Sequence, residues 1–321
     1  FKTLRRYFRR RVNLLVKGQC RLEQQHILPE QKKILWIFLC MPQIGDTLMD
    51  LSSRILLSDK KLSLFSRPVV CNLMKYDQYF NELISNEEDL RNKNYDLIII
   101  DGFTSKSLRI KNRYFKKIPF VSMERFFYGA QFNRTLFSFC RMHDLLNISS
   151  NLENIKKNAK LVITLPYNLT NTITHSSKII AIAVGGVQSY RTYTKWDNLV
   201  IKLIEKYPDF KFIIVGTQYS TEICRKNLQL HKVDNYVGKL SIFETAHIIK
   251  QSNLLMCADS GLLHIANAVS TPVLALFAGP IAPEIRMTGF KNSKALYHSE
   301  SVDRIAPEKI ISAFNEVISN L

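Results

Sequence analysis

Apolar residues along this chain form short, nearly uninterrupted runs, and stretches with helical spacing separate most of them. Runs rich in Ile, Val, Leu and Phe are typical of parallel strands that are buried on both faces. They lie at 32–40, 68–72, 95–103, 118–122, 179–184, 211–215, 256–258 and 271–277. Helical patterns lie at 46–57, 124–146, 196–207, 221–230, 243–251 and 307–320. Because strands and helices alternate, the sequence predicts an α/β fold with helices on both faces of parallel sheets.

The chain is long enough for two domains, and one segment is suited to join them. Residues 165–178 are low in charge and rich in Thr, Asn and Ser, a composition that is typical of a linker. The sequence therefore predicts two doubly wound, Rossmann-like domains with a cleft between them. The expected divisions are a basic amphipathic segment at 1–31, a first domain at 32–165, a linker at 166–178, a second domain at 179–306 and a carboxyl-terminal helix at 307–321.

Charge is distributed unevenly along the chain. Lys and Arg exceed Asp and Glu by 45 to 27, a net charge of +18, and residues 1–22 hold eight basic residues and no acidic one. Among these cations Leu4, Phe8, Val12 and Leu15 follow helical spacing. Residues 1–22 therefore predict a basic helix that binds an anionic membrane surface, or else a solvated helix packed on its own domain. No nucleic-acid partner is expected, because no motif for one is recognisable.

Cysteine usage and hydropathy bear on the compartment. The six cysteines stand singly, without CxxC pairs, so we expect reduced and mostly buried thiols. No apolar stretch reaches the roughly 18 residues of a membrane span, and no signal-peptide core is recognisable. These features indicate a cytoplasmic protein, soluble or peripheral to a membrane. No HxxxH, DxD or Cys/His cluster indicates a metal, and we expect no cofactor.

A first candidate site follows the strand that ends at Cys40. Gly45 lets the chain turn and approach a ligand closely, and Asp46 stands where the next helix begins. An aspartate there is either the N-cap of the helix, which position alone favours, or a general base at the carboxyl end of a strand.

A second candidate site is the turn Gly185-Gly186 with the polar loop that follows it. Paired glycines after a strand allow close approach of the backbone to a ligand. Arg191 and Lys195 supply positive charge for a phosphate. Trp196 opens the next helix and is expected to pack in the core, not to stack on a base.

The third candidate site is the turn Asp259-Ser260-Gly261, with His264 following three residues later. The turn lies between a strand and a helix, where open α/β sheets bind ligands and where helix amides attract phosphate. His264 is either a ligand-binding residue or a helix histidine that is satisfied by the backbone. Together the three turns would surround a nucleotide diphosphate in a cleft.

In order and spacing these motifs resemble the heptosyltransferases of glycosyltransferase family 9, over about residues 33–320. The most specific part runs from Asp259 to Pro280. The residues that carry the resemblance are Gly45 and Asp46, Gly185 and Gly186, Lys195 and Trp196, 237–241, 259–266, Pro272 and 277–280.

The resemblance implies a GT-B fold and an inverting transfer of heptose from ADP-heptose to the inner-core sugar of lipid A in lipopolysaccharide, without metal or cofactor. It implies that Asp46 deprotonates the acceptor hydroxyl, with Gly45 and Thr47 on the acceptor side. Donor binding is implied for Gly185, Gly186, Lys195, Glu222, Asp259, Ser260, Gly261 and His264. Such an enzyme would meet its lipid-linked core oligosaccharide at the cytoplasmic face of the bacterial inner membrane.

Three positions depart from the family pattern and leave the donor sugar open. Ser260 stands where Thr is usual, Asp197 where Pro is usual, and Ala278-Gly279-Pro280-Ile281 replaces Gly-Pro-Thr. The alternatives are transfer of another nucleotide-linked sugar, a protein acceptor, or a non-catalytic nucleotide-sugar-binding protein. Several arginines of the first domain are expected to be solvated or to bind anionic groups of the acceptor: Arg109, Arg113, Arg125 and Arg134.

Overall fold

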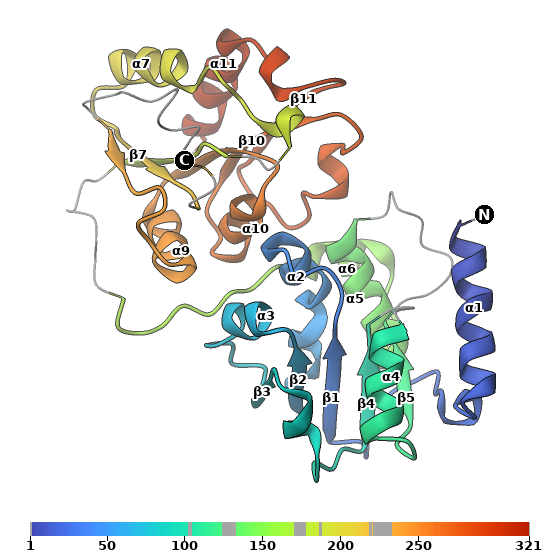
Figure 1. The fold of residues 1–321 in the computed structure, drawn as a ribbon. Helices are drawn as coiled ribbons and strands as arrows, with labels where there is room; N and C mark the ends of the chain where they lie inside the picture. The colour runs from blue at the N-terminus through green and yellow to red at the C-terminus, as the bar shows by residue number, and fades with distance from the viewer. Residues whose placement is uncertain are drawn as a thin grey trace. The chain divides into compact units, whose positions relative to one another are not determined.

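The chain forms two compact units, Phe1–Ala159 and Lys160–Leu321, called here the amino-terminal unit and the carboxyl-terminal unit (Figure 1). The computed structural model describes residues 2–101, 105–123, 133–169, 178–185, 188–217, 220 and 233–320, but not the side chains of 2–7, 10 and 105. The division between the units falls within the stretch predicted as the first domain, before residue 165. Residues 170–177 of the expected linker lie outside the described residues.

The described part of the amino-terminal unit holds a parallel sheet with the strand order β3-β2-β1-β4-β5. Its strands are β1 (Lys33–Phe38), β2 (Lys61–Ser66), β3 (Glu82–Ile84), β4 (Leu97–Ile100) and β5 (Phe120–Ser122). Its helices are α1 (Lys2–Val16), η1 (Cys20–Leu22), α2 (Ile44–Asp50), η2 (Ser52–Leu57), α3 (Pro68–Leu73), η3 (Glu87–Leu90), α4 (Ser105–Tyr114), α5 (Arg134–Leu145) and α6 (Leu152–Asn158).

The described part of the carboxyl-terminal unit holds a second parallel sheet, with the order β11-β10-β9-β6-β7-β8. Its strands are β6 (Ile179–Ala183), β7 (Lys211–Val215), β8 (Asp234–Asn235), β9 (Leu254–Ala258), β10 (Val273–Ala278) and β11 (Lys294–His298). Its helices are η4 (Ser189–Arg191), α7 (Trp196–Lys206), α9 (Ile242–Gln251), α10 (Gly261–Ala268), η6 (Pro283–Ile285), η7 (Val302–Arg304) and α11 (Pro307–Ile318).

Strands β1, β6, β9 and β10 lie inside their sheets and come from the most uninterrupted apolar runs. Strand β1 is buried from Ile34 to Phe38, and every residue of β9 is buried. Helix α7 packs on the second sheet through Trp196, which is 1% exposed and meets Tyr193 edge to face at a ring distance of 5.2 Å. The packing role predicted for Trp196 is confirmed.

Two sequence expectations in the amino-terminal unit are wrong. The run 68–72, predicted as a strand, forms helix α3, because Pro68 lies at its first turn, where a fixed φ and a missing N–H favour helix entry. The strand lies just before it, at β2. The helix expected over 46–57 is two pieces, α2 and the 3₁₀-helix η2, with Leu51 between them at φ −89° and ψ 5°. Residues 124–132 and 221–230, expected to be helical, lie outside the described residues.

No disulfide joins the described cysteines Cys20, Cys40, Cys71, Cys140 and Cys257. The expectation that most thiols are buried is wrong for these five, because only Cys140 and Cys257 are buried. None of the described helices combines the length and apolar character that a bilayer span requires.

Candidate functional site

In each sheet the strand order reverses beside the first strand of the unit, and several of the candidate residues follow the strands at that point. In the amino-terminal unit β1 lies between β2 and β4, and in the carboxyl-terminal unit β6 lies between β7 and β9. Crossovers from such a central strand leave to opposite sides, which opens a crevice at the carboxyl ends of the strands. The turns after β1, β4, β6 and β9 are therefore the positions to inspect for a ligand site.

Asp46 lies in the first turn of α2, after β1. The expectation that it caps this helix is wrong: Gln43 occupies the N-cap, and Asp46 is the third helical residue. A carboxylate in a first turn is favoured by the partial positive charge of the helix amino end. Gly45 and Thr47, expected on the acceptor side, are buried within α2. Asp46 thus stands at the predicted strand end without serving as the cap.

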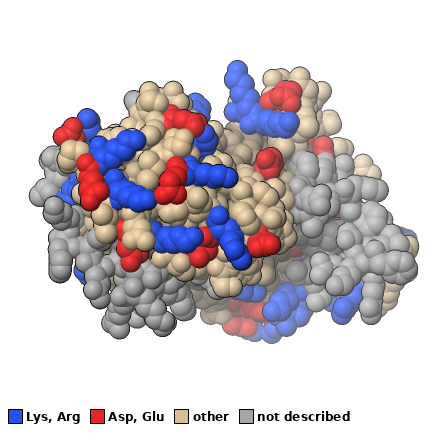
Figure 2. All heavy atoms as spheres, turned by 90° about the horizontal axis from the view of Figure 1, so that it is seen from above, with Lys and Arg blue, Asp and Glu red and all other residues tan. Residues whose placement is uncertain are grey.

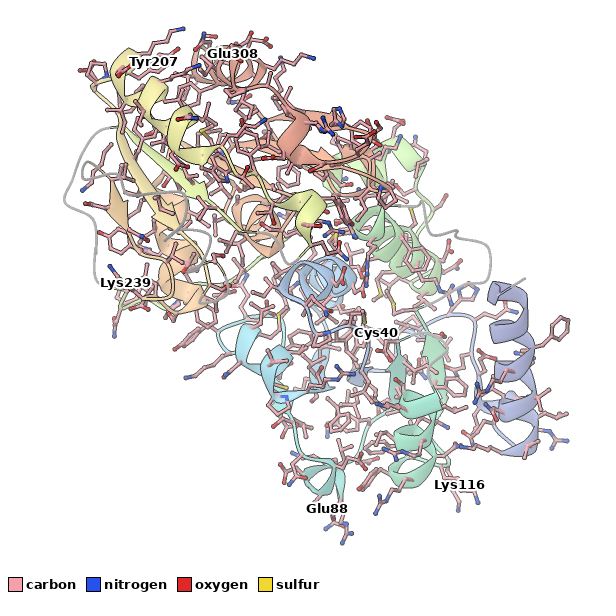
Figure 3. All side chains as sticks on the ribbon, turned by 45° about the horizontal axis from the view of Figure 1, so that its top comes forward. Cys40, Glu88, Lys116, Tyr207, Lys239 and Glu308 are labelled. Carbon is pink, nitrogen blue, oxygen red and sulfur yellow. The ribbon has the colours of Figure 1, made fainter. Side chains whose placement is uncertain are left out.

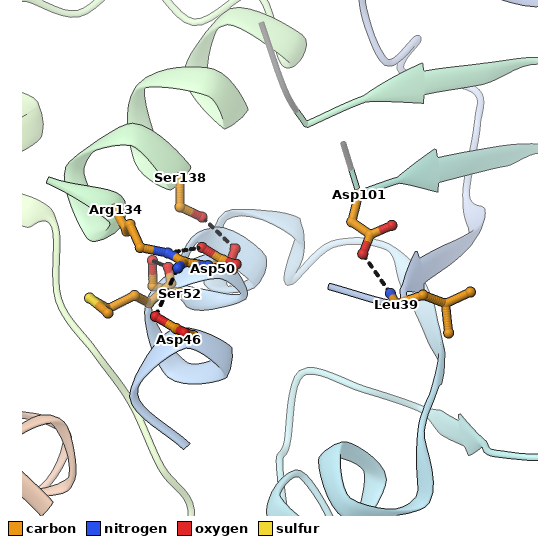
Figure 4. A network of polar contacts seen from close by, with 8 residues as sticks. Leu39, Asp46, Asp50, Ser52, Asp101, Arg134 and Ser138 are labelled. Carbon is orange, nitrogen blue, oxygen red and sulfur yellow. Dashed lines mark hydrogen bonds and ion pairs between the residues drawn. The ribbon is translucent and has the colours of Figure 1, made fainter. Parts of the chain in front are cut away.

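Arg134 bridges two carboxylates on α2 (Figure 4). Its Nη1 donates to Asp46 Oδ1 at 2.8 Å, while its Nε donates to Asp50 Oδ1 at 2.8 Å and its Nη2 pairs with Asp50 Oδ2. Burial opposes the charge of Arg134, but Asp50 and Asp46 outweigh this and raise the pKa of the guanidinium above its ordinary value. Asp50 thus receives a two-point contact, which fixes the guanidinium plane that faces Asp46.

The surroundings of this cluster fix its geometry further. Arg134 is the first residue of α5, whose N-cap Asn133 accepts a bond from the Leu136 amide at 3.1 Å. One turn on, the Ser138 hydroxyl donates to the Asp50 carbonyl at 2.8 Å (Figure 4). The α2–α5 contact is therefore held by both side chains and main chain. Arg134 is not simply solvated, whereas Arg109 and Arg113 pair with Glu87 at exposed positions.

Asp101 follows β4 directly, on the other side of the same switch point, and sequence reasoning did not single it out. It is 4% exposed and accepts from the Leu39 amide at 2.5 Å (Figure 4). It also accepts from the Ser107 hydroxyl. Burial raises the pKa of Asp101 to about 7, although these neutral donors counteract it. The signal was present in the sequence, because an aspartate directly after a buried apolar run marks the strand end, as at Asp259.

Asp259 occupies the switch point of the carboxyl-terminal unit, after β9. It is 5% exposed and pairs with Arg191 of η4, the two side chains meeting at 3.2 Å. Tyr190 accepts from the same guanidinium and packs against Gly279, where a Cβ would lie 3.3 Å from its ring and where φ is +67°. The loop after β6 is therefore bound to the ends of β9 and β10 by an ion pair and a ring contact.

Ser260 and Gly261 form the amino end of α10. Ser260 is the N-cap, yet its side chain makes no capping bond, and its buried Oγ has no hydrogen-bond partner among the described residues. The first amides of a helix lack partners inside the helix, so a phosphate placed here can accept from them. His264 lies 3% exposed inside α10. The turn thus offers a hydroxyl and helix amides next to Arg191.

The remaining predicted donor residues lie elsewhere or are not described. The Lys195 ammonium donates to the Asp303 carbonyl at 2.7 Å, which ties the start of α7 to η7. Gly185 is explained by packing, since a Cβ there would collide with the Ser220 hydroxyl. Gly186 and Glu222 lie outside the described residues. Among the residues that are described, no group of three or more His, Cys, Asp or Glu side chains is placed to hold a metal ion.

Comparisons with solved structures identify the fold. A glycosyltransferase family 9 structure from Veillonella parvula has a TM-score of 0.75 and 14% identity, covering 93% of this chain and 100% of its own. E. coli ADP-heptose LPS heptosyltransferase II has a TM-score of 0.71 and 17% identity, covering 90% and 99%. E. coli heptosyltransferase WaaC with ADP has a TM-score of 0.67 and 14% identity, covering 88% and 99%. The predicted α/β fold of the GT-B type is thereby confirmed.

Sequence comparison adds the family. No curated protein sequence matches the chain. The model of glycosyltransferase family 9 (heptosyltransferase) matches residues 140–300, half of the chain, and this range contains the Asp259 turn, Arg191 and Lys195. The chain belongs to glycosyltransferase family 9, the heptosyltransferase family.

Proposed function

We propose that the protein is an inverting glycosyltransferase that moves heptose from ADP-heptose to an inner-core sugar of lipopolysaccharide. Family membership supports the transferase, and the similar E. coli structures are an ADP-heptose LPS heptosyltransferase and a heptosyltransferase with ADP. The observation that carries the proposal is the Asp46 carboxylate at the carboxyl end of β1, oriented by Arg134, which Asp50 braces in turn.

Asp46 is proposed as the general base. Its carboxylate takes the proton of the acceptor hydroxyl while the hydroxyl oxygen attacks the anomeric carbon of the heptose. The bond from that carbon to the diphosphate oxygen breaks, the configuration inverts, and ADP leaves with the bonding electrons. Arg134 keeps one carboxylate oxygen in a defined direction, which is what a positioned base requires.

The carboxyl-terminal unit is proposed to hold the donor diphosphate. The α10 amides, the Ser260 hydroxyl and Arg191 provide donors and positive charge that would stabilise the leaving ADP. The Lys195 ammonium uses one N–H to donate to the Asp303 carbonyl, and its other N–H groups are proposed to donate to a phosphate. Gly185, Gly186, Glu222, Asp259, Gly261 and His264 remain proposed donor residues. The reaction is proposed to need neither metal nor cofactor.

The proposed acceptor is lipid-linked, so the enzyme is proposed to work at the cytoplasmic face of the bacterial inner membrane. Residues 1–22, with eight basic and no acidic side chains, are the part proposed to meet the anionic membrane surface. No nucleic-acid partner is proposed.

Replacing Asp46 by Asn tests the base. The amide keeps the shape of the carboxylate and an oxygen for Arg134 but cannot take a proton, so kcat should fall by about 10³-fold. The Kd for ADP should stay within about twofold, because the α10 turn is untouched. Steady-state turnover of ADP-heptose on heptose-deficient lipopolysaccharide and calorimetric titration with ADP give the two readouts.

Asp50→Asn is the matched control, since it pairs with the same arginine from the same helix. It should lower kcat by no more than about tenfold, because Asp50 positions the base and does not take the proton. Wild-type turnover in Asp46→Asn would contradict the base assignment. A thermal-shift panel of ADP, UDP and GDP sugars checks the donor, and nucleotide binding without any turnover would instead indicate a binding protein.

A further inference from the structure

Among the described side chains of helix α1, Leu14 anchors the helix in the amino-terminal unit and Arg11 pairs with Glu23 at 2.7 Å. Leu14 is fully buried in the core that contains Leu35 and Ile98. The helix ends at Val16, and Gly18 follows with a φ of +62°. The Gln19 amide donates to the Leu14 carbonyl at 2.8 Å and the Gly18 amide donates to the Leu15 carbonyl at 2.9 Å. This pair of bonds with glycine in the left-handed region is a Schellman motif, which fixes where the helix stops.

A buried polar clamp follows the turn. Gln19 is 2% exposed, and its side-chain oxygen accepts from the Lys111 ammonium of α4. Its side-chain Nε2 donates to the Lys116 carbonyl at 3.3 Å. Farther on, the Gln24 amide donates to the Phe120 carbonyl at 2.8 Å, which attaches the segment to strand β5. The orientation of α1 on the unit is therefore set by packing and hydrogen bonds near its carboxyl end.

The opposite side of α1 is apolar and faces solvent. Phe8, Val12, Leu15 and Val16 follow helical spacing and are 59%, 57%, 72% and 78% exposed. We call these four residues the α1 stripe. Figure 3 shows side chains of α1 projecting away from the rest of the unit. A continuous stripe of large apolar side chains exposed to water is unusual and indicates a binding surface.

Charge decides which partner fits the α1 stripe. The stripe lies within residues 1–22, which carry eight basic and no acidic residues. The carboxyl-terminal unit differs, because basic and acidic side chains are interspersed on the face shown in Figure 2 and pair in contacts such as Lys202–Glu308. An apolar stripe on a segment whose sequence is rich in basic residues matches the interface of an anionic bilayer, which accepts apolar side chains and attracts cations, although Arg11 is already paired with Glu23 at 2.7 Å.

We propose that α1 lies flat on an anionic lipid bilayer and inserts the α1 stripe into it, while Leu14 and the Gln19–Lys111 clamp hold the amino-terminal unit on the helix. This docking rests on the proposed function, because a lipid-linked acceptor is the reason to bind a membrane. It adds to that function the residues that enter the lipid. Lys111, Leu14 and Gln19 act as positioning residues, because they transmit the docking of the helix to the unit.

The test uses the full chain and vesicles of phosphatidylcholine with about 30% phosphatidylglycerol, compared with phosphatidylcholine alone. Replacing Phe8, Val12, Leu15 and Val16 by Ser keeps every charge and should lower partitioning into the anionic vesicles at least about tenfold in flotation assays. The matched control Ile148→Ser/Leu152→Ser removes two other half-exposed apolar side chains of the same unit and should bind like the wild type. Deleting residues 1–22 is a poorer test, because it also removes Leu14 and Gln19 from the core.

A second variant tests insertion directly. Both native tryptophans, Trp36 and Trp196, are 1% exposed, so an indole introduced by Phe8→Trp should dominate any change in emission. Its emission should shift to shorter wavelength with the anionic vesicles and stay unchanged without them.

Three outcomes would overturn the proposal. They are wild-type binding by the serine variant, no emission shift for Phe8→Trp, and lipid-independent self-association that the serine variant abolishes, which would make the α1 stripe an interface between two copies. ADP titration of the serine variant separates these outcomes from failure of the proposed transferase function, since nucleotide binding does not involve α1.

Discussion

Asp101 and Asp259 occupy the same topological place in the two units but have opposite surroundings. Each follows the strand that pairs with the first strand of its unit, β4 with β1 and β9 with β6, and each is no more than 5% exposed. Asp101 accepts from a hydroxyl and an amide, both neutral, and its pKa is raised to about 7 by burial. Asp259 instead faces the guanidinium of Arg191 at 3.2 Å.

Topology supplies a position in the fold, and the neighbouring residues decide the chemistry of the side chain that stands there. A buried carboxyl with neutral donors favours its protonated form, whereas a buried carboxylate beside an arginine favours the charged one. In the amino-terminal unit Arg134 forms ion pairs with Asp46 and Asp50 and not with Asp101. Three experiments test this contrast.

The largest expected effect is on the pH dependence of stability. The folded pKa of Asp101 is about 7, above the 3.8 of an unperturbed carboxyl, so the native state keeps a proton that the unfolded chain releases. This group therefore lowers the free energy of unfolding as the pH rises from about 4 to about 7, by up to about 4 kcal/mol. Asp101→Asn should remove that part of the slope in urea denaturation measured across the same pH range.

Asp59→Asn serves as the control, because Asp59 is 61% exposed and pairs with Lys60 at 3.4 Å on the surface. Its pH slope should match that of the wild type. An unchanged slope in Asp101→Asn would show that Asp101 is ionised in the folded protein, and the contrast with Asp259 would disappear.

The second effect concerns the partner of Asp259. Arg191→Leu leaves this buried carboxylate without its cation, which should lower the free energy of unfolding by about 2–3 kcal/mol, since Arg191 itself is partly exposed. Adding Asp259→Asn should restore most of the loss. Arg304→Leu, at a pair that is 71% exposed on both sides, should change stability by less than about 0.5 kcal/mol. Equal losses for Arg191→Leu and Arg304→Leu would argue against a structural ion pair.

The smallest effects compare two serines. Ser260→Ala removes a buried hydroxyl that has no partner among the described residues, so stability should change by less than about 0.5 kcal/mol while ADP affinity falls about fivefold to tenfold. Ser107→Ala removes a donor to Asp101 and should cost about 1–2 kcal/mol of stability without changing ADP affinity. Calorimetric titration with ADP measures the affinity of both variants, and urea denaturation measures their stability. A loss of ADP affinity in Ser107→Ala but not in Ser260→Ala would contradict the assignment of Ser260 to the donor site.

Much of the fold could be predicted because buried parallel strands leave a strong pattern. The apolar run at 211–215 is β7, and the helix predicted at 307–320 is α11, which begins at Pro307 and ends at Ile318. The short strands β3, β8 and β11 were missed, since two or three residues, or a half-exposed edge strand, carry little periodicity. Pro68 misled the prediction because a short apolar run does not by itself distinguish a strand from one helical turn.

The candidate site could be predicted in position but not in contacts. Asp46 and the Asp259 turn were found because each stands at a strand end, a signal that sequence carries directly. The bridge through Arg134 joins residues 88 positions apart and could not be deduced from spacing. The same holds for the role of Asp46. Position favoured capping, but the helix begins at Ile44 with Gln43 as its N-cap, and the Asp46 carboxylate instead accepts from Arg134.

The clamp beneath α1 bears on how recombinant versions of this protein are designed. Trimming the chain to begin near Lys32 would look harmless, since the first strand starts at Lys33. It would open a hole where Leu14 fills the core and leave the Lys111 ammonium, 0% exposed as a residue, without the Gln19 oxygen. Solubility problems are therefore better addressed by mutating the outer residues of α1 than by deleting the helix.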